Sequence, residues 1–252
     1  KQVFKQQNVV LLLVLALLLI PVTGLAAPLI PNINIDVGTA TNPQEVSTSL
    51  QILALMTILS LAPAILIMTT SFIRIIVVLS FLRSALATQQ MPPNQVIVGL
   101  ALFLTFFVMS PYLQQANEKV LQPYLNGTIT QERAIDETVK PIREFMFKQT
   151  RESDLALFVN LSQAPQPDTP EDVSTLTLVP AFVISELKTA FQIGFMIYIP
   201  FIVIDMIVAS TLMSMGMMML PPVMISLPFK ILLFVMVDGW HLIIRSLIVS
   251  FK

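Results

Sequence analysis

The sequence predicts an all-α membrane protein, built from two long helical hairpins that are separated by a small helical domain. Of its 252 residues, 55% are hydrophobic and 12% are charged, which is about half the charged share of a soluble domain. Long apolar stretches dominate both halves of the chain, whereas most of the charge lies in residues 112–178. The apolar stretches are therefore assigned to the membrane and the charged segment to the space outside it.

Residues 1–27 are predicted to be a signal peptide. A short basic start precedes an apolar run from Val9 to Ile20, and Gly24-Leu25-Ala26-Ala27 offers small residues for cleavage. A run of about 12 apolar residues is too short to cross a bilayer, which takes about 20. An uncleaved anchor is the alternative. Residues 28–48, rich in Pro, Asn and Thr, follow as an extended lead-in.

The first membrane hairpin is predicted over residues 49–110. Leu50 to Leu86 is almost continuously apolar, and a second apolar segment runs from Val96 to Ser110, where Pro111 is expected to end it. Between them lies Met91-Pro92-Pro93, and a pair of prolines cannot continue a helix. This proline pair is therefore the predicted tip of the hairpin.

Residues 111–178 are predicted to form a small helical domain outside the cytoplasm. Thr130 is a suitable capping residue for a helix that Pro141 would kink or restart, and a shorter helix is expected from Ser153 to Leu161. Thr169-Pro170-Glu171-Asp172 is also typical of a helix start, because it places a capping hydroxyl before proline and two acids.

The second membrane hairpin is predicted over residues 179–252, with apolar segments from Val179 to Met213 and from Val223 to Phe251. Leu220-Pro221-Pro222 lies between them, as Met91-Pro92-Pro93 does in the first hairpin. If the N-terminus is outside, both tips point to the cytoplasm.

The second tip contains a run in which four of the five residues from Met215 to Met219 are methionine. Methionine is unbranched and polarizable, so it can repack around a shape that changes. Ordinary apolar filling is one alternative to such a soft seal. A copper(I) site of thioethers at positions 213, 215 and 217 is another, which the lack of Cys and the single, distant His disfavour. The candidate seal residues are Met215, Met217, Met218 and Met219.

Eight charged or titratable side chains interrupt the apolar segments: Arg74, Glu186, Lys188, Asp205, Lys230, Asp238, His241 and Arg245. A charge in the middle of a bilayer costs about 2.5 to 3.5 kcal/mol on insertion scales, so these groups must pair, line a cavity or lie outside the hydrocarbon. Glu186 and Lys188 are two residues apart and do not face each other on a helix, so each needs a partner elsewhere. No nucleophile–base arrangement or metal-ligand spacing accompanies them, and we predict neither an enzyme nor a cofactor or metal site.

The charges of the last segment are predicted to share one face. If Val223 to Phe251 is a single helix, then at about 100° per residue Lys230, Asp238, His241 and Arg245 fall on one arc of about 80°. This polar stripe would face a partner subunit or an aqueous channel. The alternative is a helix end that rises into the lipid headgroups, where a long basic side chain extends toward water.

Several motifs resemble, in order, those of the FliP and SctR family of type III secretion export-gate proteins. These motifs are Met68–Ile75, Pro93-Asn94-Gln95, Gly99–Thr105, Met109-Ser110-Pro111, Arg143–Met146, Gln149–Glu152, Ser185–Phe195, Gly216–Met219, Pro221-Pro222, Leu227–Lys230 and Val237–Trp240. The resemblance extends over about residues 48–251. It is closer to the flagellar branch than to the virulence branch, and the signal peptide agrees with this.

The resemblance implies a pore-forming core subunit of the flagellar export gate, which passes unfolded flagellar subunits through the bacterial inner membrane at the basal body. About five copies would assemble with FliQ-like and FliR-like membrane subunits into a helical pore complex, together with FlhB-like and FlhA-like export components. The resemblance also implies a periplasmic location for the small domain. The net charge of −1 disfavours a nucleic-acid partner.

The same resemblance implies roles for individual residues. Met217, Met218 and Met219 match a methionine gasket that narrows the closed pore, and Met215 lies beside them. Glu186, with Phe145 and Phe158 of the small domain, is implied in contacts between subunits, as are the charges Arg74, Lys188, Asp205, Lys230, Asp238 and Arg245. Two other functions stay open: a small-solute or ion transporter that binds an anion along the Lys230–Arg245 stripe, and a passive assembly scaffold.

Overall fold

A computed structural model describes residues 43–88, 91–162, 166–217 and 219–252 of the chain. Every regular element in these ranges is a helix, and none of these residues lies in a strand. The chain divides into two units, residues 1–52 and 53–252, and the contacts given below lie within the second. The predicted all-α class is confirmed. The predicted signal peptide lies outside the described residues, as does most of the lead-in.

The first apolar segment forms two helices, α2 (Pro43–Thr69) and α3 (Phe72–Ala85), instead of one. The break falls at the polar patch, where the hydroxyls of Thr69 and Thr70 donate to the carbonyls four residues back. Such back-bonding competes with regular helix geometry and bends helices. Since α2 begins at Pro43, residues 43–48, predicted as the end of an extended lead-in, are helical.

Helix α4 (Asn94–Ala116) does not end at Pro111 as predicted. It passes through the proline and continues into a π-helical turn, η1 (Asn117–Leu121), and the short α5 (Gln122–Leu125). A proline inside a helix removes one main-chain hydrogen bond and adds a local clash, and here the apolar helix tolerates both. The segment assigned to the first hairpin thus extends into the residues assigned to the small domain.

The small helical domain contains α6 (Gln131–Gln149) and α7 (Glu152–Leu161), close to the predicted ranges. The Thr130 hydroxyl accepts a hydrogen bond from the amide of Arg133 at 3.5 Å and caps α6, as predicted. Helix α6 continues through Pro141. The signature at Thr169 forms only one 3-10 turn, η2 (Pro170–Asp172).

The second hairpin consists of α8 (Thr175–Ser214), α9 (Pro222–Met236) and α10 (Gly239–Val249). Ser174 caps α8, which runs for 40 residues and includes two prolines. The final segment breaks at Asp238, whose backbone is left-handed with φ 49°, and α9 and α10 are bent by 65°. The prediction of one continuous final helix is therefore wrong.

The described helices include three that are long and apolar enough to cross a membrane, namely Leu50–Thr69, Asn94–Leu125 and Thr175–Ser214. The bent pair α9 and α10 adds a fourth if it is counted as one span. These helices are consistent with the predicted membrane protein. Pro92-Pro93 lies in the turn before α4, and Pro221-Pro222 lies at the start of α9, where the tips were predicted.

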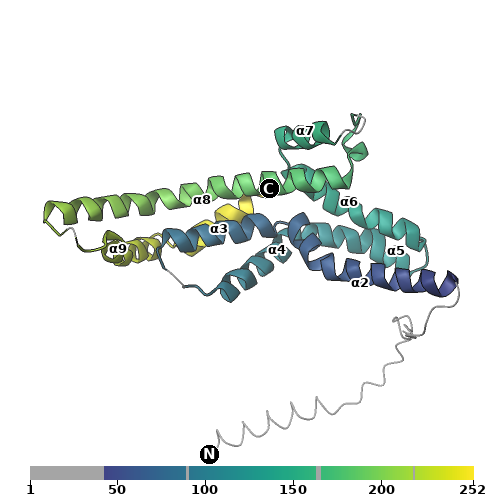
Figure 1. Cartoon of the computed structure of the whole chain (residues 1–252), viewed down its shortest axis with the longest axis horizontal. Helices are drawn as coiled ribbons and strands as arrows, with labels where there is room; N and C mark the ends of the chain where they lie inside the picture. The colour runs from purple at the N-terminus through teal and green to yellow at the C-terminus, as the bar shows by residue number, and fades with distance from the viewer. Residues whose placement is uncertain (1–42, 89–90, 163–165, 218) are drawn as a thin grey trace, which may run out of the picture. The chain divides into compact units, whose positions relative to one another are not determined.

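The core of the second unit forms where α3 lies along α8, and α4, α6, α7 and α9 complete it (Figure 1). Gly194 of α8 permits the close approach of α3, because a Cβ atom built there would lie 2.6 Å from the ring of Phe81. At the small-domain end, Phe145 of α6 packs edge-on against Phe182 of α8, with ring centroids 5.7 Å apart. These contacts place the polar side chains of α3 and α8 opposite one another.

Candidate functional site

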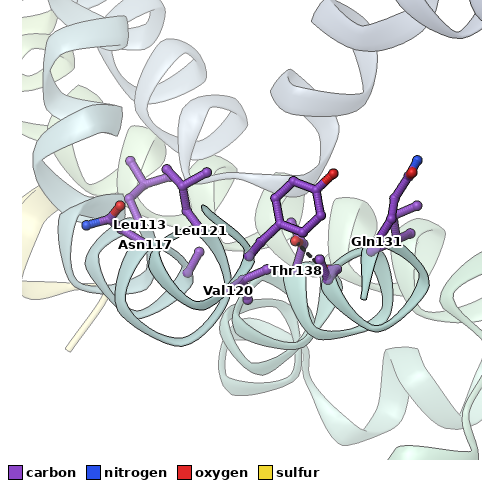
Figure 2. Close-up of a pocket in the computed structure, with 10 residues that line it drawn as sticks. Leu113, Asn117, Val120, Leu121, Gln131 and Thr138 are labelled. Atoms are coloured by element: carbon purple, nitrogen blue, oxygen red, sulfur yellow. Dashed lines mark hydrogen bonds between the residues drawn. The ribbon is translucent and has the colours of Figure 1, made fainter. Parts of the chain in front are cut away.

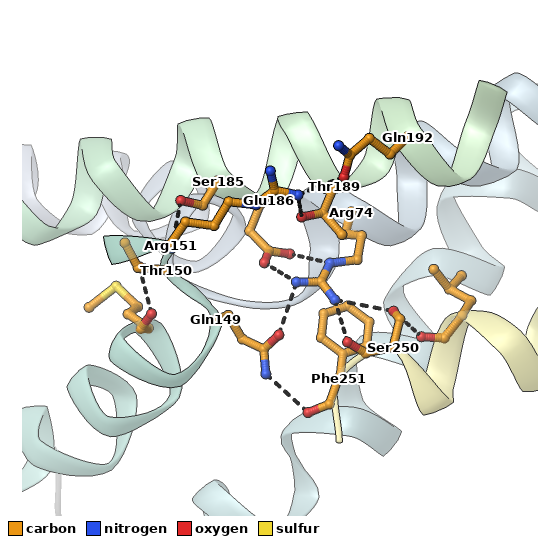
Figure 3. A network of polar contacts seen from close by, with 12 residues as sticks. Arg74, Gln149, Thr150, Arg151, Ser185, Glu186, Thr189, Gln192, Ser250 and Phe251 are labelled. Atoms are coloured by element: carbon orange, nitrogen blue, oxygen red, sulfur yellow. Dashed lines mark hydrogen bonds and ion pairs between the residues drawn. The ribbon is translucent and has the colours of Figure 1, made fainter. Parts of the chain in front are cut away.

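A buried arginine joins four parts of the chain (Figure 3). Arg74 of α3 donates from Nε to the Glu186 carboxylate of α8 at 2.9 Å, and its Nη2 forms a second, shorter bond to the same carboxylate. Nη2 also donates to Gln149, the last residue of α6, at 2.9 Å. Nη1 donates to the carbonyl of Ser250 at 2.8 Å and to its hydroxyl at 3.1 Å. The Phe251 ring lies 4.0 Å from the guanidinium carbon.

These contacts use all five N–H groups of the guanidinium. A buried ion pair repays its desolvation only with good geometry and further hydrogen bonds, and a bidentate arginine–carboxylate pair supplies the best geometry available. Glu186 is fully buried and Arg74 nearly so. We call Arg74, Glu186, Gln149, Ser250 and Phe251 the arginine hub. The partner that Glu186 needs is thus Arg74 of its own chain, whereas the resemblance implied that Glu186 takes part in contacts between subunits.

A second polar cluster lies beside the hub. The buried Asp154 of α7 accepts a hydrogen bond from the Ser185 hydroxyl of α8 at 2.8 Å, and the same hydroxyl accepts one from the amide of Arg151. Lys188 lies 3.9 Å from Asp154. Because Lys188 is half exposed, this long pair adds little stability. The cluster fixes α7 against α8.

A third cluster connects α8, α9 and α3 near the two tips. Lys230 of α9 donates to Asp205 of α8 at 2.6 Å and to the main-chain carbonyl of Ala85 in α3 at 3.4 Å. The buried Ser226 hydroxyl donates to the other carboxylate oxygen of Asp205. Lys230 is only 2% exposed. We call Lys230, Asp205 and Ser226, with the Ala85 carbonyl, the lysine cluster.

The predicted charged stripe is not found. Lys230 faces the interior on α9, Asp238 lies in the break, and His241 and Arg245 lie on α10, across a 65° bend. Asp238, His241 and Arg245 are exposed. The helical-wheel argument failed because it assumed one axis for both helices.

The methionine run forms the turn between α8 and α9. The side chains of Met215, Met217 and Met219 are 67%, 40% and 99% exposed, and Gly216 supplies the left-handed backbone at φ 74°. Met218 lies outside the described residues. The described methionines of the turn do not pack into the core of the chain.

The two phenylalanines singled out in the small domain differ in placement. Phe145 is 1% exposed and packs among aromatic rings of its own chain, including Tyr112 at 5.2 Å between centroids. Phe158 on α7 is half-buried. Phe158 is accessible to a neighbouring molecule, whereas Phe145 stabilises the core.

An apolar groove of about 420 Å³ lies between the end of α4 and α6 (Figure 2), and no pattern in the sequence predicted it. Leu113, Val120, Leu121 and Tyr124 line one side, and Ile135 lines the other. The groove includes the π-helical turn, a feature that no periodicity argument anticipates.

Sequence reasoning also missed Gln149, Ser226, Ser250 and Phe251. One signal could have found some of them: a buried arginine requires acceptors for five N–H groups, and one carboxylate cannot provide them all. In the part of the chain that the structure describes, no group of three or more His, Cys, Asp or Glu side chains could hold a metal ion.

Comparison with known proteins gives a consistent result. The model of the FliP family matches residues 55–247. The relatives of this chain include three proteins with the name "Flagellar biosynthetic protein FliP". The Bacillus subtilis protein is 58% identical over 217 residues, covering 86% of this chain and 98% of the relative. The Pectobacterium carotovorum protein is 55% identical over 219 residues, 85% of each chain. The Aquifex aeolicus protein is 45% identical over 237 residues, 93% of this chain and 98% of the relative.

Proposed function

This chain belongs to the FliP family, and from that premise we propose that it is a pore-forming core subunit of the flagellar type III protein-export gate. As a family member it is a membrane component of flagellar biosynthesis and export. The finer proposal is that copies of the chain line a path through which unfolded flagellar subunits leave the cytoplasm. The proposal assigns no catalytic step to the chain.

The observation that best supports a gate is the exposed methionine turn. Met215, Met217 and Met219 project from the connection between α8 and α9. An exposed methionine turn has little value to an isolated chain, whereas several copies around a pore would form a ring of soft, adaptable thioethers. Such a ring would narrow the closed path and mould itself to a passing polypeptide. Met218 belongs to the same proposed gasket by sequence.

Assembly with other subunits is supported by the apolar surface of the helices. Phe103, Phe106 and Phe107 on α4 are largely exposed, and a surface of this kind requires lipid or a partner to cover it. We propose that the partners are other copies of this chain, about five in all, and FliQ-like and FliR-like membrane subunits. FlhB-like and FlhA-like components would complete the export apparatus.

The buried charges have a different role in this proposal. Arg74, Glu186, Asp205 and Lys230 are engaged within the chain, so they shape the subunit instead of joining it to a neighbour. Among the charges picked out from the sequence, the exposed Asp238 and Arg245 of the final segment are available for subunit contacts, as is the half-exposed Lys188.

We further propose that the chain resides in the bacterial inner membrane at the basal body, with α6 and α7 in the periplasm. Two features support this orientation: the predicted signal peptide would place the mature N-terminus outside, and the small domain holds most of the charge. A protease added from the periplasmic side should cut α6 or α7 before it cuts either Pro-Pro turn.

The proposal is tested by removing the methionine side chains. Met215, Met217 and Met219 are changed together to Ala in the assembled complex, and leakage of small solutes through the resting complex is measured. Leakage should rise while assembly stays intact, because the narrow ring has lost its side chains.

The matched control changes Met196, Met206 and Met236 to Ala. These three methionines are similarly exposed but lie on helices, and their loss should leave the complex tight. If the turn variant assembles and leaks no more than this control, the proposal that these methionines seal a pore is wrong. A passive scaffold would then explain the chain better than a gate. Retention of a small anion by the purified chain would instead indicate a transporter.

A further inference from the structure

The lysine cluster connects both tips of the molecule through one ammonium group. Lys230 lies on α9, about eight residues or 12 Å along the helix from its start at Pro222. Its Nζ donates to Asp205 of α8 at 2.6 Å and to the Ala85 carbonyl of α3 at 3.4 Å. One side chain thus touches the helices on both sides of the methionine turn and the helix that leads to the other turn.

The contact with Ala85 acts on the end of α3. Ala85 is the last residue of that helix, where carbonyls lack partners within the helix and the dipole is negative. The buried ammonium of Lys230 donates to an unpaired carbonyl and also places a positive charge at the negative end of the helix. The Tyr198 hydroxyl of α8 donates to the neighbouring carbonyl of Ser84 at 3.4 Å. Beyond this point Ala87 turns left-handed, with φ 56°, and the chain enters the first Pro-Pro turn.

The contact with Asp205 fixes α8 against α9. Asp205 precedes Met215 by about ten residues, or about 15 Å along the helix. The Ser226 hydroxyl, one helical turn from Lys230, donates to the second carboxylate oxygen. With both oxygens occupied by donors from α9, sliding or rotation of α9 along α8 would break at least one bond.

We infer that Lys230 is a positioning residue that holds the methionine turn in a fixed relation to the end of α3 and the first Pro-Pro turn. This inference rests on the proposed function only for the reason why the turn needs a fixed position. A ring of methionines can seal a pore only if every copy presents its methionines at the same height. The bonds to Asp205 and Ala85 are made within one chain and do not depend on the gate.

Removing the ammonium of Lys230 should release the methionine turn from its fixed position. Changing Lys230 to Met keeps most of the volume and removes the ammonium, so Asp205 keeps only the Ser226 bond and the Ala85 carbonyl loses its donor. The side chain of Asp205 is 29% exposed, so the carboxylate that loses its partner lies at the surface of the chain and not in its core. The variant therefore folds, but α9 is free to move relative to α3.

The absence of Cys from the chain permits a direct measurement. Ser84 and Met224 are exposed residues at the end of α3 and the start of α9, and both are changed to Cys to carry spin labels. Pulsed electron paramagnetic resonance on the assembled complex, with labelled chains diluted into unlabelled ones, gives the distance within one chain. The parent should show one narrow distance distribution.

Three variants of this labelled chain separate positioning from stability. Lys230→Met should shift or broaden the distribution. Lys140→Met, which removes an exposed lysine of the small domain, should match the parent. Lys230→Met combined with Asp205→Asn removes the unpaired charge and should recover the assembly yield of the parent, while the distribution stays altered because Ala85 still lacks its donor.

The outcomes are distinguishable from those of the gate test. If Lys230→Met gives the parent distribution, or if the double variant restores it, Lys230 does not position the turn. If Lys230→Met changes the distribution but neither it nor the methionine variant leaks, the positioning stands and the seal is wrong. A changed distribution together with leakage supports both.

Discussion

At the scale of single residues, an apolar helix accepts a buried arginine when every donor of that arginine is used. The guanidinium of Arg74 meets acceptors from Glu186, Gln149 and Ser250 and stacks on Phe251. A lysine could not replace it, because an ammonium is a point charge without the planar fork that reaches three partners at once. The hub therefore defines the contact of α3 with the small domain and with the end of α10.

The first prediction at this scale concerns the two charges of the hub. Arg74→Met leaves the Glu186 carboxylate buried without its cation, and we expect a loss of about 3 to 5 kcal/mol in the free energy of unfolding. Lowered thermal stability and faster proteolysis of the detergent-solubilised protein would record this loss. Adding Glu186→Leu should return most of the stability, because both members of the pair are then apolar.

A surface pair provides the control for the hub. Lys188→Met removes a half-exposed lysine that lies 3.9 Å from Asp154, and pairs of this kind contribute about 0 to 1 kcal/mol. If Arg74→Met is no more harmful than Lys188→Met, the hub does not stabilise the fold.

At the scale of the helices, the break between α9 and α10 decides where the final charges point. Asp238 takes the left-handed backbone, and Gly239 begins α10 directly against the ring of Phe234, where a Cβ atom would lie 2.2 Å from a ring carbon. Glycine is required here by space, because no larger side chain fits between the helix start and the ring.

The corresponding prediction compares two glycines. Gly239→Ala should destabilise the bend by about 1 to 3 kcal/mol through overpacking against Phe234, as measured by thermal unfolding. Gly99→Ala lies inside α4 with nothing within 4 Å of the new Cβ, and should stabilise by about 0.5 to 1 kcal/mol. Equal effects of the two changes would contradict the close packing.

The 3-10 turn η2 offers a test that depends on pH. The Thr169 hydroxyl donates to the Asp172 carboxylate and so does the Thr169 amide, and these bonds lower the pKa of Asp172. Because the pKa is lower in the folded state, this support is complete above the unfolded value and disappears as the pH falls through the folded value. Thr169→Ala should move the pKa of Asp172 back up toward its usual value, as read by nuclear magnetic resonance. An unchanged pKa would mean that the hydroxyl does not hold the carboxylate.

At the scale of the whole molecule, the sequence predicted what depends on local composition. The membrane class, the position of both Pro-Pro turns, the capped start of α6 and the helix near Ser153 all follow from neighbouring residues. Glu186 and Arg74 are 112 residues apart, so their pairing depends on how α3 packs along α8. Hydrophobic periodicity does not contain that information.

The other differences have the same origin. Pro111 did not end its helix and Pro141 did not restart its own, because the loss of one hydrogen bond is small beside the packing of a long helix. The stripe on the last segment disappeared because a bend at one residue rotates every side chain beyond it. Local rules located the elements of this protein, and tertiary contacts determined which side chains meet.

The arginine hub also has a consequence for the order in which the protein is made. Arg74 lies 176 residues before Ser250, so its helix leaves the ribosome long before two of its five acceptors exist. Until residues 250 and 251 have been made, Nη1 lacks the acceptors of Ser250 and the guanidinium lacks the ring of Phe251. The hub therefore closes only after residue 251 has been made, so α3 waits through 176 further residues for its last hydrogen bonds.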